Sequence, residues 1–198
     1  MRRFAPIASA CTLFFLTTIA YSQQIDVAVG ANTLLTSKNN TSSLAFVPPR
    51  EAGGTYPSVS ADILLRKRIG LNLETSWRVK QANYNGSEKY RPILTDVNAL
   101  FQPKVGKNLG LDLMGGLGIA SNRFYLPGNT PCTGGASPCY TSSNHLMEHL
   151  SGGVRYYAWH NFFVRPEIHY YHVQNNTGFR SGNLFRVGAS IGYTLDRH

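Results

Sequence analysis

The sequence predicts an all-β protein built as a single up-and-down antiparallel barrel of eight strands. Three observations predict it. Apolar residues recur at every second position in eight separate segments. The connections between these segments alternate between short and long, and the positions between the apolar residues hold small residues or single charges. Almost no stretch has the spacing of an amphipathic helix.

The N-terminal segment, residues 1–22, has the layout of a secretory signal peptide. Two arginines come first, an apolar run extends from Ile7 to Ala20, and Ser22 supplies a small residue at its end. We expect cleavage after Ser22, because the run is shorter than the ~20 residues that a membrane-spanning helix needs. The mature chain, residues 23–198, then has the length of one domain, the barrel.

The first four predicted strands occupy residues 24–35, 58–66, 69–80 and 93–101. Small or charged residues on the opposite face accompany the apolar alternation in each of them. At every second residue, their apolar faces run from Ile25 to Leu35, from Val59 to Leu65, from Ile69 to Val79 and from Ile93 to Phe101.

The last four predicted strands occupy residues 109–120, 149–158, 162–173 and 185–195. Pro166 lies inside the seventh strand, and because proline lacks a backbone donor it predicts a bulge or a local break. The closing strand is the most regular, so we expect it to close the barrel by pairing with the first. Its apolar face comprises Phe185, Val187, Ala189, Ile191, Tyr193 and Leu195.

The connections divide the predicted barrel into two different ends. Strands two and three, four and five, and six and seven are joined by short turns, at Lys67 and Arg68, "QPKVGKN" and "WHN". The other connections are long and polar. They comprise residues 37–54, 81–92, 121–146 and 174–182. This pattern is typical of an up-and-down barrel with an even strand count, in which both termini lie at the short-turn end.

Two kinds of barrel fit this outline, a soluble lipid carrier of the lipocalin type and a barrel that crosses a membrane. A soluble barrel needs a polar outer face rich in Lys and Glu, whereas the polar face here has small residues and nearly balanced single charges. That composition indicates a narrow, packed interior in which acids and bases pair, with the apolar face toward lipid. The predicted interior charges are Asp62, Glu74, Arg78, Asp96, Asp112, Arg155, Arg165, Glu167 and Arg186.

Aromatic residues near both ends of the strands favour the membrane barrel, because bilayers select interfacial aromatic belts. Such residues also cap strand ends in other β proteins. The short-turn group is Phe101, Trp159, Phe162, Phe163 and Tyr193, and the long-loop group is Tyr56, Tyr84, Tyr90, Phe124, Tyr125, Tyr170 and Phe179.

The whole mature chain resembles the OmpA/OmpX type of eight-stranded outer-membrane barrel of Gram-negative bacteria. Its last strand is similar to that family's assembly signal, a polar residue, glycine, a hydrophobic residue and an aromatic residue at fixed spacing. Arg186, Gly188, Ile191 and Tyr193 occupy these positions. The family commonly ends on an aromatic residue, whereas residues 194–198 follow Tyr193 here.

The resemblance implies an outer-membrane location and a monomer. Its implied partners are outer-membrane lipid and lipopolysaccharide, the barrel assembly machinery and periplasmic chaperones. The formal net charge of +9 is spread along the chain, and an exported protein does not meet cytoplasmic DNA, so we expect no nucleic-acid partner. Anionic lipid headgroups are a better match to the positive charge.

Two stretches raise the question of an enzyme. The stretch "HLMEH" at residues 145–149 matches the H-x-x-E-H zinc-protease pattern, but that pattern needs a helix and paired glycines follow it here. A chance metal site from His145 and His149 stays open. The stretch "EIHYYHVQNNTG" resembles the late His-x-Ser-Asn region of lipid A deacylase barrels, but Gln174 stands at the position of the nucleophile. A structural network of Glu167, His169 and Arg165 is the other interpretation.

We therefore expect a non-enzymatic outer-membrane barrel without a cofactor, whose four long loops carry a structural or surface-binding role. The alternatives are a barrel enzyme acting on lipid A or phospholipid, and a narrow gated channel. We also expect a disulfide between Cys132 and Cys139, because "TPCTGGASPCY" turns back easily and an exported chain meets oxidising conditions. Two free thiols or a metal pair are the alternatives to that bond.

Overall fold

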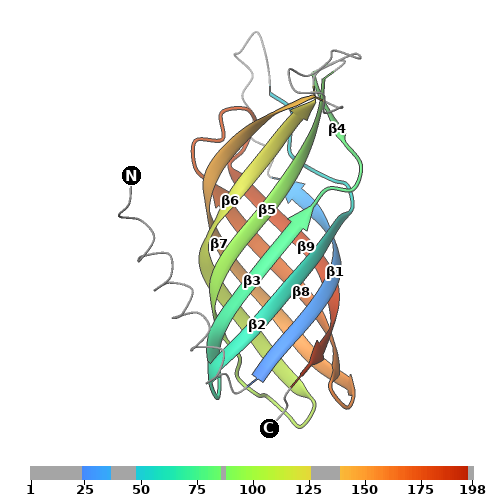
Figure 1. Cartoon of the computed structure of the whole chain (residues 1–198), viewed down its shortest axis with the longest axis vertical. Coiled ribbons are helices and arrows are strands. Elements are labelled where there is room, and N and C mark those ends of the chain that lie inside the picture. Colours follow the sequence, from blue (N-terminus) through green and yellow to red (C-terminus); the bar gives the residue numbers. More distant parts are fainter. Residues whose placement is uncertain (1–23, 37–47, 86–87, 126–138, 196–198) are drawn as a thin grey trace, which may run out of the picture.

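The computed structural model describes residues 24–36, 48–85, 88–125 and 139–195. These residues form nine antiparallel strands and no helix (Figure 1). The strands are β1 (Gln24–Thr36), β2 (Tyr56–Arg66), β3 (Ile69–Trp77), β4 (Ala82–Asn85), β5 (Glu88–Phe101), β6 (Leu109–Tyr125), β7 (Tyr140–Trp159), β8 (Phe162–Val173) and β9 (Asn183–Thr194).

Eight of the strands close into a barrel. The hydrogen-bonded order is β3-β2-β1-β9-β8-β7-β6-β5, and a further pairing of β3 with β5 completes the ring. The short strand β4 pairs with β5 and extends above the ring as a hairpin arm (Figure 1). The prediction of a single up-and-down eight-stranded barrel is therefore confirmed.

The first and last barrel strands meet along one continuous seam. Pairs of residues join β1 to β9 from Asp26 opposite Thr194 to Thr36 opposite Leu184. One further bond beyond the strand end, from the Leu195 amide to the Ile25 carbonyl, spans 2.8 Å. The closing strand is therefore paired along both edges, with β1 on one side and β8 on the other.

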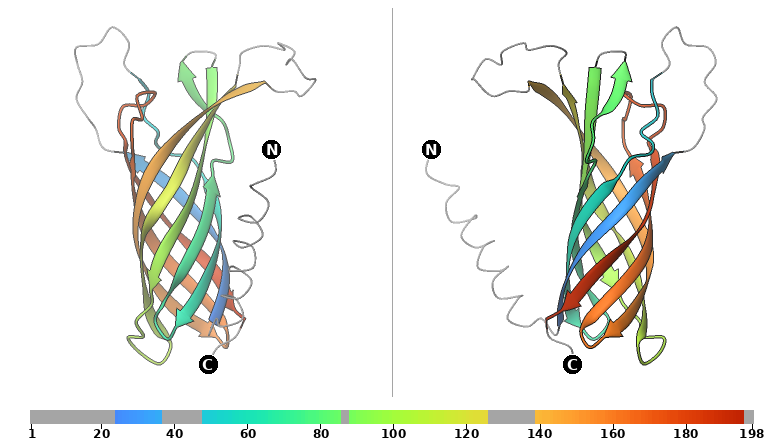
Figure 2. Two further views of the ribbon diagram at one scale, coloured as in Figure 1. Left: turned by 60° about the vertical axis from the view of Figure 1, so that its left-hand side comes forward. Right: turned by 90° about the vertical axis from the view of Figure 1, so that its right-hand side faces the viewer.

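The two ends of the barrel differ as the connection lengths predict. The β2–β3, β5–β6 and β7–β8 connections are short and lie together at one end, which we call the turn end (Figure 2). The opposite end, which we call the loop end, holds the long connections and the β4 arm (Figure 2).

Two of the predicted long loops are shorter than expected. Strand β6 continues to Tyr125 and β7 already begins at Tyr140, so much of the predicted loop 121–146 is a β-hairpin. Strand β5 likewise begins at Glu88 inside the predicted loop 81–92. Both extensions lie at the loop end, where polar residues occupy both faces, so the apolar alternation disappears although the backbone ladder continues.

Side chains alternate between a buried inner face and an exposed outer face along every barrel strand. The outer face is apolar, with exposed fractions of 62% at Val29, 61% at Leu150 and 59% at Ile191. Within the described residues, no helix has the length and apolar character needed to span a membrane. Strands of this length and alternation are those that cross a bilayer at a tilt.

Pro166 produces no bulge. The register between β8 and β9 runs unbroken through the pair of Pro166 with Ala189. Toward β7, the register is the same on both sides, but the ladder is interrupted between the Gly153–Glu167 and Tyr156–Val164 pairs. The proline therefore interrupts pairing on one side only, because its missing donor faces a single neighbour.

Candidate functional site

The lumen near the turn end is filled by an ion-pair cluster around Arg155. This arginine is fully buried and its guanidinium forms an ion pair with Asp26. It also lies 2.6 Å from a carboxylate oxygen of Asp62 and 2.8 Å from one of Asp112. Three carboxylates from β1, β2 and β6 thus converge on one cation from β7, which links strands on opposite sides of the barrel.

Arg165 extends this cluster from β8. Its guanidinium lies 3.0 Å from Asp62, 3.1 Å from Asp112 and 2.7 Å from Glu167. Asp62 and Asp112 therefore each bind both arginines. Such shared, charge-assisted hydrogen bonds fix the side chains in a single arrangement.

A second polar layer lies deeper in the barrel, around Arg186 and two histidines. Arg186 pairs with Glu74 and donates to His169 Nε2 at 2.9 Å. His169 Nδ1 lies 3.0 Å from His149 Nε2, and His149 Nδ1 lies 2.7 Å from the Asn98 side-chain oxygen. Because a guanidinium only donates, His169 Nε2 accepts, so His169 Nδ1 donates to His149 Nε2 and His149 Nδ1 donates to Asn98.

The same layer holds the one group among the described residues with the composition of a metal site. Ligand atoms of Glu74, Glu167 and His169 lie within 4.8 Å of one another. However, Arg186 donates to His169 and pairs with Glu74. The guanidinium thus takes the place that a cation would need, and the arrangement favours a structural network over a metal centre.

The predicted interior charges separate into two groups. Eight of them are buried in the lumen, namely Asp62, Glu74, Asp96, Asp112, Arg155, Arg165, Glu167 and Arg186. Arg78 lies outside this network, at the loop end, where its Nη1 is 3.4 Å from the Ala52 carbonyl oxygen. Sequence reasoning left out Asp26 and His149 as network members, although Asp26 alternates onto the same face of β1 and signals its position.

Above the polar layers, an apolar layer fills the lumen toward the loop end. Its members are all at most 2% exposed, and Tyr171 and Leu184 are fully buried. Side chains packed to this degree exclude water from the cross-section of the barrel. The layer consists of Leu34, Tyr56, Leu94, Ala120, Met147, Tyr171, Val173 and Leu184.

Four aromatic rings form a cap over this layer, which we call the aromatic cap: Tyr84, Tyr90, Phe124 and Phe179. The ring centroids of Tyr90 and Phe179 are 4.8 Å apart, and those of Tyr84 and Phe124 are 4.9 Å apart. The Tyr84 hydroxyl donates to the Gly178 carbonyl at 2.8 Å, so β4 is tied to the β8–β9 connection.

The aromatic cap corrects the prediction of a lipid-facing belt at the loop end. Tyr56, Tyr90 and Phe179 of the predicted belt are buried, whereas Tyr125 and Tyr170 of the same group lie on the outer face. Aromatic residues near strand ends are expected both in a lipid-facing belt and as caps of strands in other β proteins. Here Tyr56 and Tyr90 lie at inward-facing positions of their strands. At the turn end, Trp159 and Phe162 are exposed on the outer face as predicted, whereas Phe163 of the same predicted group is fully buried.

A buried carboxyl group, Glu51, lies beneath the aromatic cap in the β1–β2 connection. It is 1% exposed, and Asn176 donates to its Oε2 at 3.5 Å. Burial raises the pKa of Glu51 to about 7, an effect that Asn176, the Arg78 charge and Asn122 only partly oppose. Glu51 therefore links the β1–β2 and β8–β9 connections, and its carboxyl group loses its proton near neutral pH.

The turn end of the lumen is also closed. The ring of Phe163 is fully buried and lies against Gly192, where any side chain would collide with it. The Arg155 guanidinium carbon lies 4.0 Å from the centroid of the same ring. Beside it, a cavity of about 20 Å³ lined by Gln102 and Lys104 has room for about one water molecule. Buried side chains therefore fill the described lumen near both of its ends.

The histidine motif of residues 145–149 lies on strand β7. His145 and His149 both face inward, whereas Glu148 is exposed on the outer face. Four residues of strand separate the two histidines by about 13 Å, which is too far for one metal ion. His145 instead lies 2.7 Å from the Ser143 hydroxyl through its Nε2.

The deacylase-like stretch faces away from the lumen. His172 is exposed on the outer face, and its Nδ1 lies 2.8 Å from the Asn183 side-chain oxygen. Gln174 donates to Glu148 at 3.1 Å. His169 and Glu167, by contrast, belong to the buried network described above.

The remaining predicted sites lie on the last strand and in the longest connection. Arg186 and Gly188 of the proposed assembly signal face the lumen, and Ile191 and Tyr193 face outward. Cys132 lies outside the described residues, so its disulfide with Cys139 stays a prediction.

The outer face near the loop end holds two neighbouring arginines that sequence reasoning missed. Arg91 and Arg123 are directly opposite each other on β5 and β6. Their guanidinium carbons lie 5.9 Å from the Tyr125 ring centroid and 4.9 Å from that of Tyr140. Neither forms an ion pair with a carboxylate among the residues that the structure describes. We call these two residues the arginine pair.

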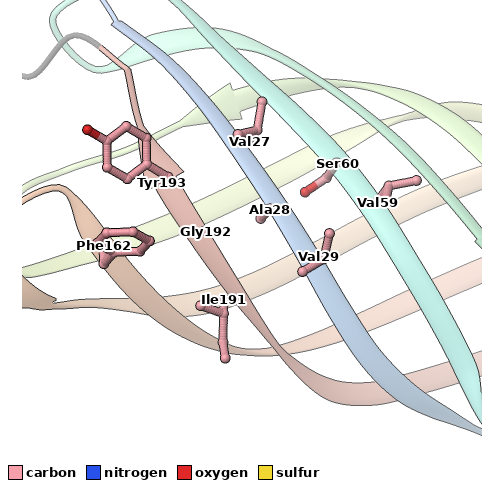
Figure 3. Close-up of a pocket in the computed structure, with 9 residues that line it drawn as sticks. All are labelled: Val27, Ala28, Val29, Val59, Ser60, Phe162, Ile191, Gly192 and Tyr193. Carbon is pink, nitrogen blue, oxygen red and sulfur yellow. The ribbon is translucent and has the colours of Figure 1, made fainter.

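Over the seam, the outer face has an open apolar groove of about 470 Å³ (Figure 3). Ala28 and Gly192 are small residues on its floor, between the larger side chains of β1 and β9. The larger lining residues are Val27, Val29, Val59, Phe162, Ile191 and Tyr193 (Figure 3). A groove so apolar on the outside of a barrel suits an acyl chain.

Comparisons with known proteins show which solved structures share this fold. No protein-family model and no curated protein matches the sequence. Solved structures do match. The N-terminal β-barrel domain of Pseudomonas aeruginosa OprF superposes with a TM-score of 0.54 at 12% identity, covering 88% of this chain and 98% of that one.

Two further barrels give the same result. Ail, the attachment invasion locus protein of Yersinia pestis, has a TM-score of 0.52 at 11% identity, covering 88% of this chain and 99% of its own. Neisserial surface protein A has a TM-score of 0.55 at 9% identity, covering 86% and 95%. At such identities the likeness concerns the fold, and the chain has the eight-stranded barrel fold of the OmpA/OmpX type of outer-membrane proteins.

Proposed function

We propose that this protein is a non-enzymatic β-barrel protein of a Gram-negative outer membrane that binds lipopolysaccharide at its loop end. One observation carries the proposal: the outer face is apolar, while the lumen holds paired charges and is closed at both ends. A soluble carrier needs the reverse arrangement, with an apolar cavity inside and charges outside. The apolar groove over the seam supports contact with lipid chains.

The closed lumen argues against the channel alternative. The apolar layer blocks the loop side, and Phe163 with Arg155 blocks the turn side. An ion crossing the barrel has to displace both, together with the buried ion pairs between them. Planar-bilayer recordings of the purified protein should show no stable conductance steps.

The arginine pair is the part of the loop end best suited to binding. Two guanidinium groups on adjacent strands match the geometry of phosphate groups, and neighbouring aromatic rings hold them in place. One Ail structure is a complex with the heparin analogue sucrose octasulfate, an anionic sugar. For the present protein, we propose the phosphates of lipopolysaccharide as the ligand, since they adjoin the loop end of an outer-membrane barrel.

The membrane location is tested by fractionation and by one pair of substitutions. The protein should sediment with the outer membrane and migrate faster on gels when unheated. Ile191→Arg places a charge on the lipid-facing side and should cost about 2 to 4 kcal/mol of stability in vesicles. The matched change Ser190→Arg, on the inner face, should act through packing instead. Recovery as a soluble protein, or a neutral Ile191→Arg, would contradict the location.

Binding is tested with Arg91→Gln combined with Arg123→Gln. Affinity for lipopolysaccharide should fall about tenfold, as expected for the loss of charge-assisted contacts, and should not fall for lipopolysaccharide that lacks its phosphates. The control, Lys104→Gln with Lys107→Gln, removes the same charge at the turn end. Equal losses in both variants would show that only net charge matters.

The enzyme alternative has one supporting observation, the contact of the Ser143 hydroxyl with His145 Nε2. A serine beside an imidazole is the minimal arrangement for nucleophilic attack on an ester. No carboxylate is seen to orient His145 among the described residues. Mass spectrometry of lipid A and phospholipid, with and without the gene, decides between the two. A lipid change lost in Ser143→Ala would establish the enzyme.

A further inference from the structure

The turn end carries a basic surface on one side of the barrel. Arg66 ends β2, Lys67 and Arg68 form the β2–β3 turn, and Lys104 and Lys107 lie in the β5–β6 connection. All five are exposed. We call these five residues the basic half-rim.

The two parts of the basic half-rim are held side by side by the backbone. Strands β3 and β5 pair next to the turns, with Ile69 opposite Phe101. The Gln102 amide then donates to the Arg68 carbonyl at 2.7 Å, so the β5–β6 connection starts where the β2–β3 turn ends. The charges therefore form one continuous surface and not two separate turns.

Within the described part of the chain, Arg66, Arg68, Lys104 and Lys107 form no ion pair with a carboxylate. Among the described residues, the acids nearest this end include Asp26 and Asp112, which are at most 1% exposed and bind Arg155 inside the lumen. The other half of the rim, around the β7–β8 turn, is instead aromatic, with Trp159 and Phe162 exposed. Of the residues that the structure describes, the exposed lysines and arginines of this end thus lie on one side.

Exposed apolar side chains adjoin the cations directly. Leu65 and Ile69 flank the β2–β3 turn with exposed fractions of 39% and 57%. Phe101 and Val105 flank the start of the β5–β6 connection with 44% and 59%. A ligand that uses both features must have an anionic head and an apolar chain, which a soluble acidic protein or a free anion lacks.

We propose that the basic half-rim binds the phosphate headgroups of anionic phospholipids in the leaflet at the turn end. The acyl chains of such a lipid lie against Ile69, Phe101 and Val105, and its phosphate meets Arg68 and Lys104. Arginine recognises phosphate through two parallel hydrogen bonds and lysine as a point charge. The protein therefore collects anionic lipid on one side only, which fixes how it faces its neighbours in the membrane. This inference rests on the proposed membrane location.

The test uses the mature chain, residues 23–198, in nanodiscs of equal phosphatidylglycerol and phosphatidylcholine, with native mass spectrometry of the lipids that stay bound. The wild type should retain phosphatidylglycerol about threefold over phosphatidylcholine, the strength of an exposed charge pair. The variant combining Arg66→Gln, Arg68→Gln, Lys104→Gln and Lys107→Gln should lose this preference.

A control variant removes two charges at the loop end outside the arginine pair, through Lys80→Gln and Lys89→Gln, and should keep the preference, whereas its match in number of charges, Arg68→Gln with Lys104→Gln, should lose it. Faster migration of unheated samples shows which variants are folded, and Arg68→Gln with Lys104→Gln replaces the fourfold variant if that one is not. No preference in the wild type, or an equal loss in the control, overturns the proposal. Because the lipid is supplied in the nanodisc, either result is independent of where the protein fractionates in cells.

Discussion

Side chains fill both halves of the lumen, but they are charged in one half and apolar in the other. Toward the turn end, Arg155 and Arg165 share Asp62 and Asp112 in a cluster of direct ion pairs. Toward the loop end, Tyr171, Leu184 and their neighbours pack without charge beneath the aromatic cap. Each half fills the barrel, but only the turn half depends on every member being present.

This difference in chemistry predicts how well each half of the lumen tolerates substitution. A buried ion pair is worth little by itself, yet removing one partner leaves a charge without compensation. An apolar layer loses only the contacts of the atoms that are removed, and its neighbours relax into part of the space. The turn half should therefore tolerate substitution poorly and the loop half moderately.

The largest expected effect comes from Arg155→Met. It leaves Asp26, Asp62 and Asp112 close together without their shared cation, and should cost about 3 to 5 kcal/mol of unfolding free energy in vesicles. Denaturant titration with a gel-shift readout measures it. A double change that adds Asp112→Asn should recover part of the loss. If Arg155→Met lowers the unfolding free energy by less than Leu184→Ala does, the proposed difference between the two halves of the lumen is wrong.

A smaller effect is expected in the apolar layer from Leu184→Ala. We expect a loss of about 2 to 3 kcal/mol, at the low end for such truncations because the loop connections above can move into the space. The same titration gives the value, and Leu184→Met, which keeps the volume, should be close to neutral. A loss that exceeds that of Arg155→Met would reverse the ranking of the two halves.

The third prediction concerns Glu51 beneath the aromatic cap. Its pKa is raised by burial from 4.5 to about 7, so the folded cap favours the protonated acid. This stabilisation is complete below pH 4.5 and is lost as the pH rises from 4.5 through about 7. Protease cleavage in the β1–β2 connection should accelerate over that range.

The matched variant Glu51→Gln keeps the size of the side chain but replaces the titrating carboxyl group with an amide. Its cleavage rate should not depend on pH between 5 and 8 beyond that of the protease itself, measured on an unfolded substrate. Identical pH profiles for the wild type and Glu51→Gln would assign the effect to another group.

The smallest effect on the barrel is expected from Cys132→Ser with Cys139→Ser. The predicted disulfide closes a short loop, and we expect at most ~2 to 3 kcal/mol, felt by the loop and not by the barrel. Gel-shift stability should stay the same while the loop is cleaved faster. Two reactive thiols in unreduced protein purified from cells would refute the bond.

Most of the barrel was predictable because its signal is local. Alternation alone assigned Val29, Val187 and Ile191 to the outer face, and the structure exposes all three. The strand ends near Tyr125 and Tyr140 were not predictable in this way, since polar residues occupy positions on both faces of this hairpin and the apolar alternation is lost.

The lumen was predictable in composition but not in pairing. Alternation shows that Asp62 and Arg155 point inward, but only the barrel's register and tilt bring β2 and β7 to the same height. Arg78 fits the same alternation, yet it lies above the apolar layer, beside Ala52. The link between Glu51 and Asn176 was beyond sequence reasoning, because both residues lie in irregular connections without a periodic signal.

The seam between β1 and β9 determines at which stage of folding the barrel can close. Hairpins such as β2–β3 and β7–β8 join neighbours in the chain and need only local search. The seam joins the first strand to the last, so it forms only after the whole chain has been made and ordered. Until then, two strand edges and the apolar outer face stay uncovered, and the chain is most prone to aggregate just before it closes.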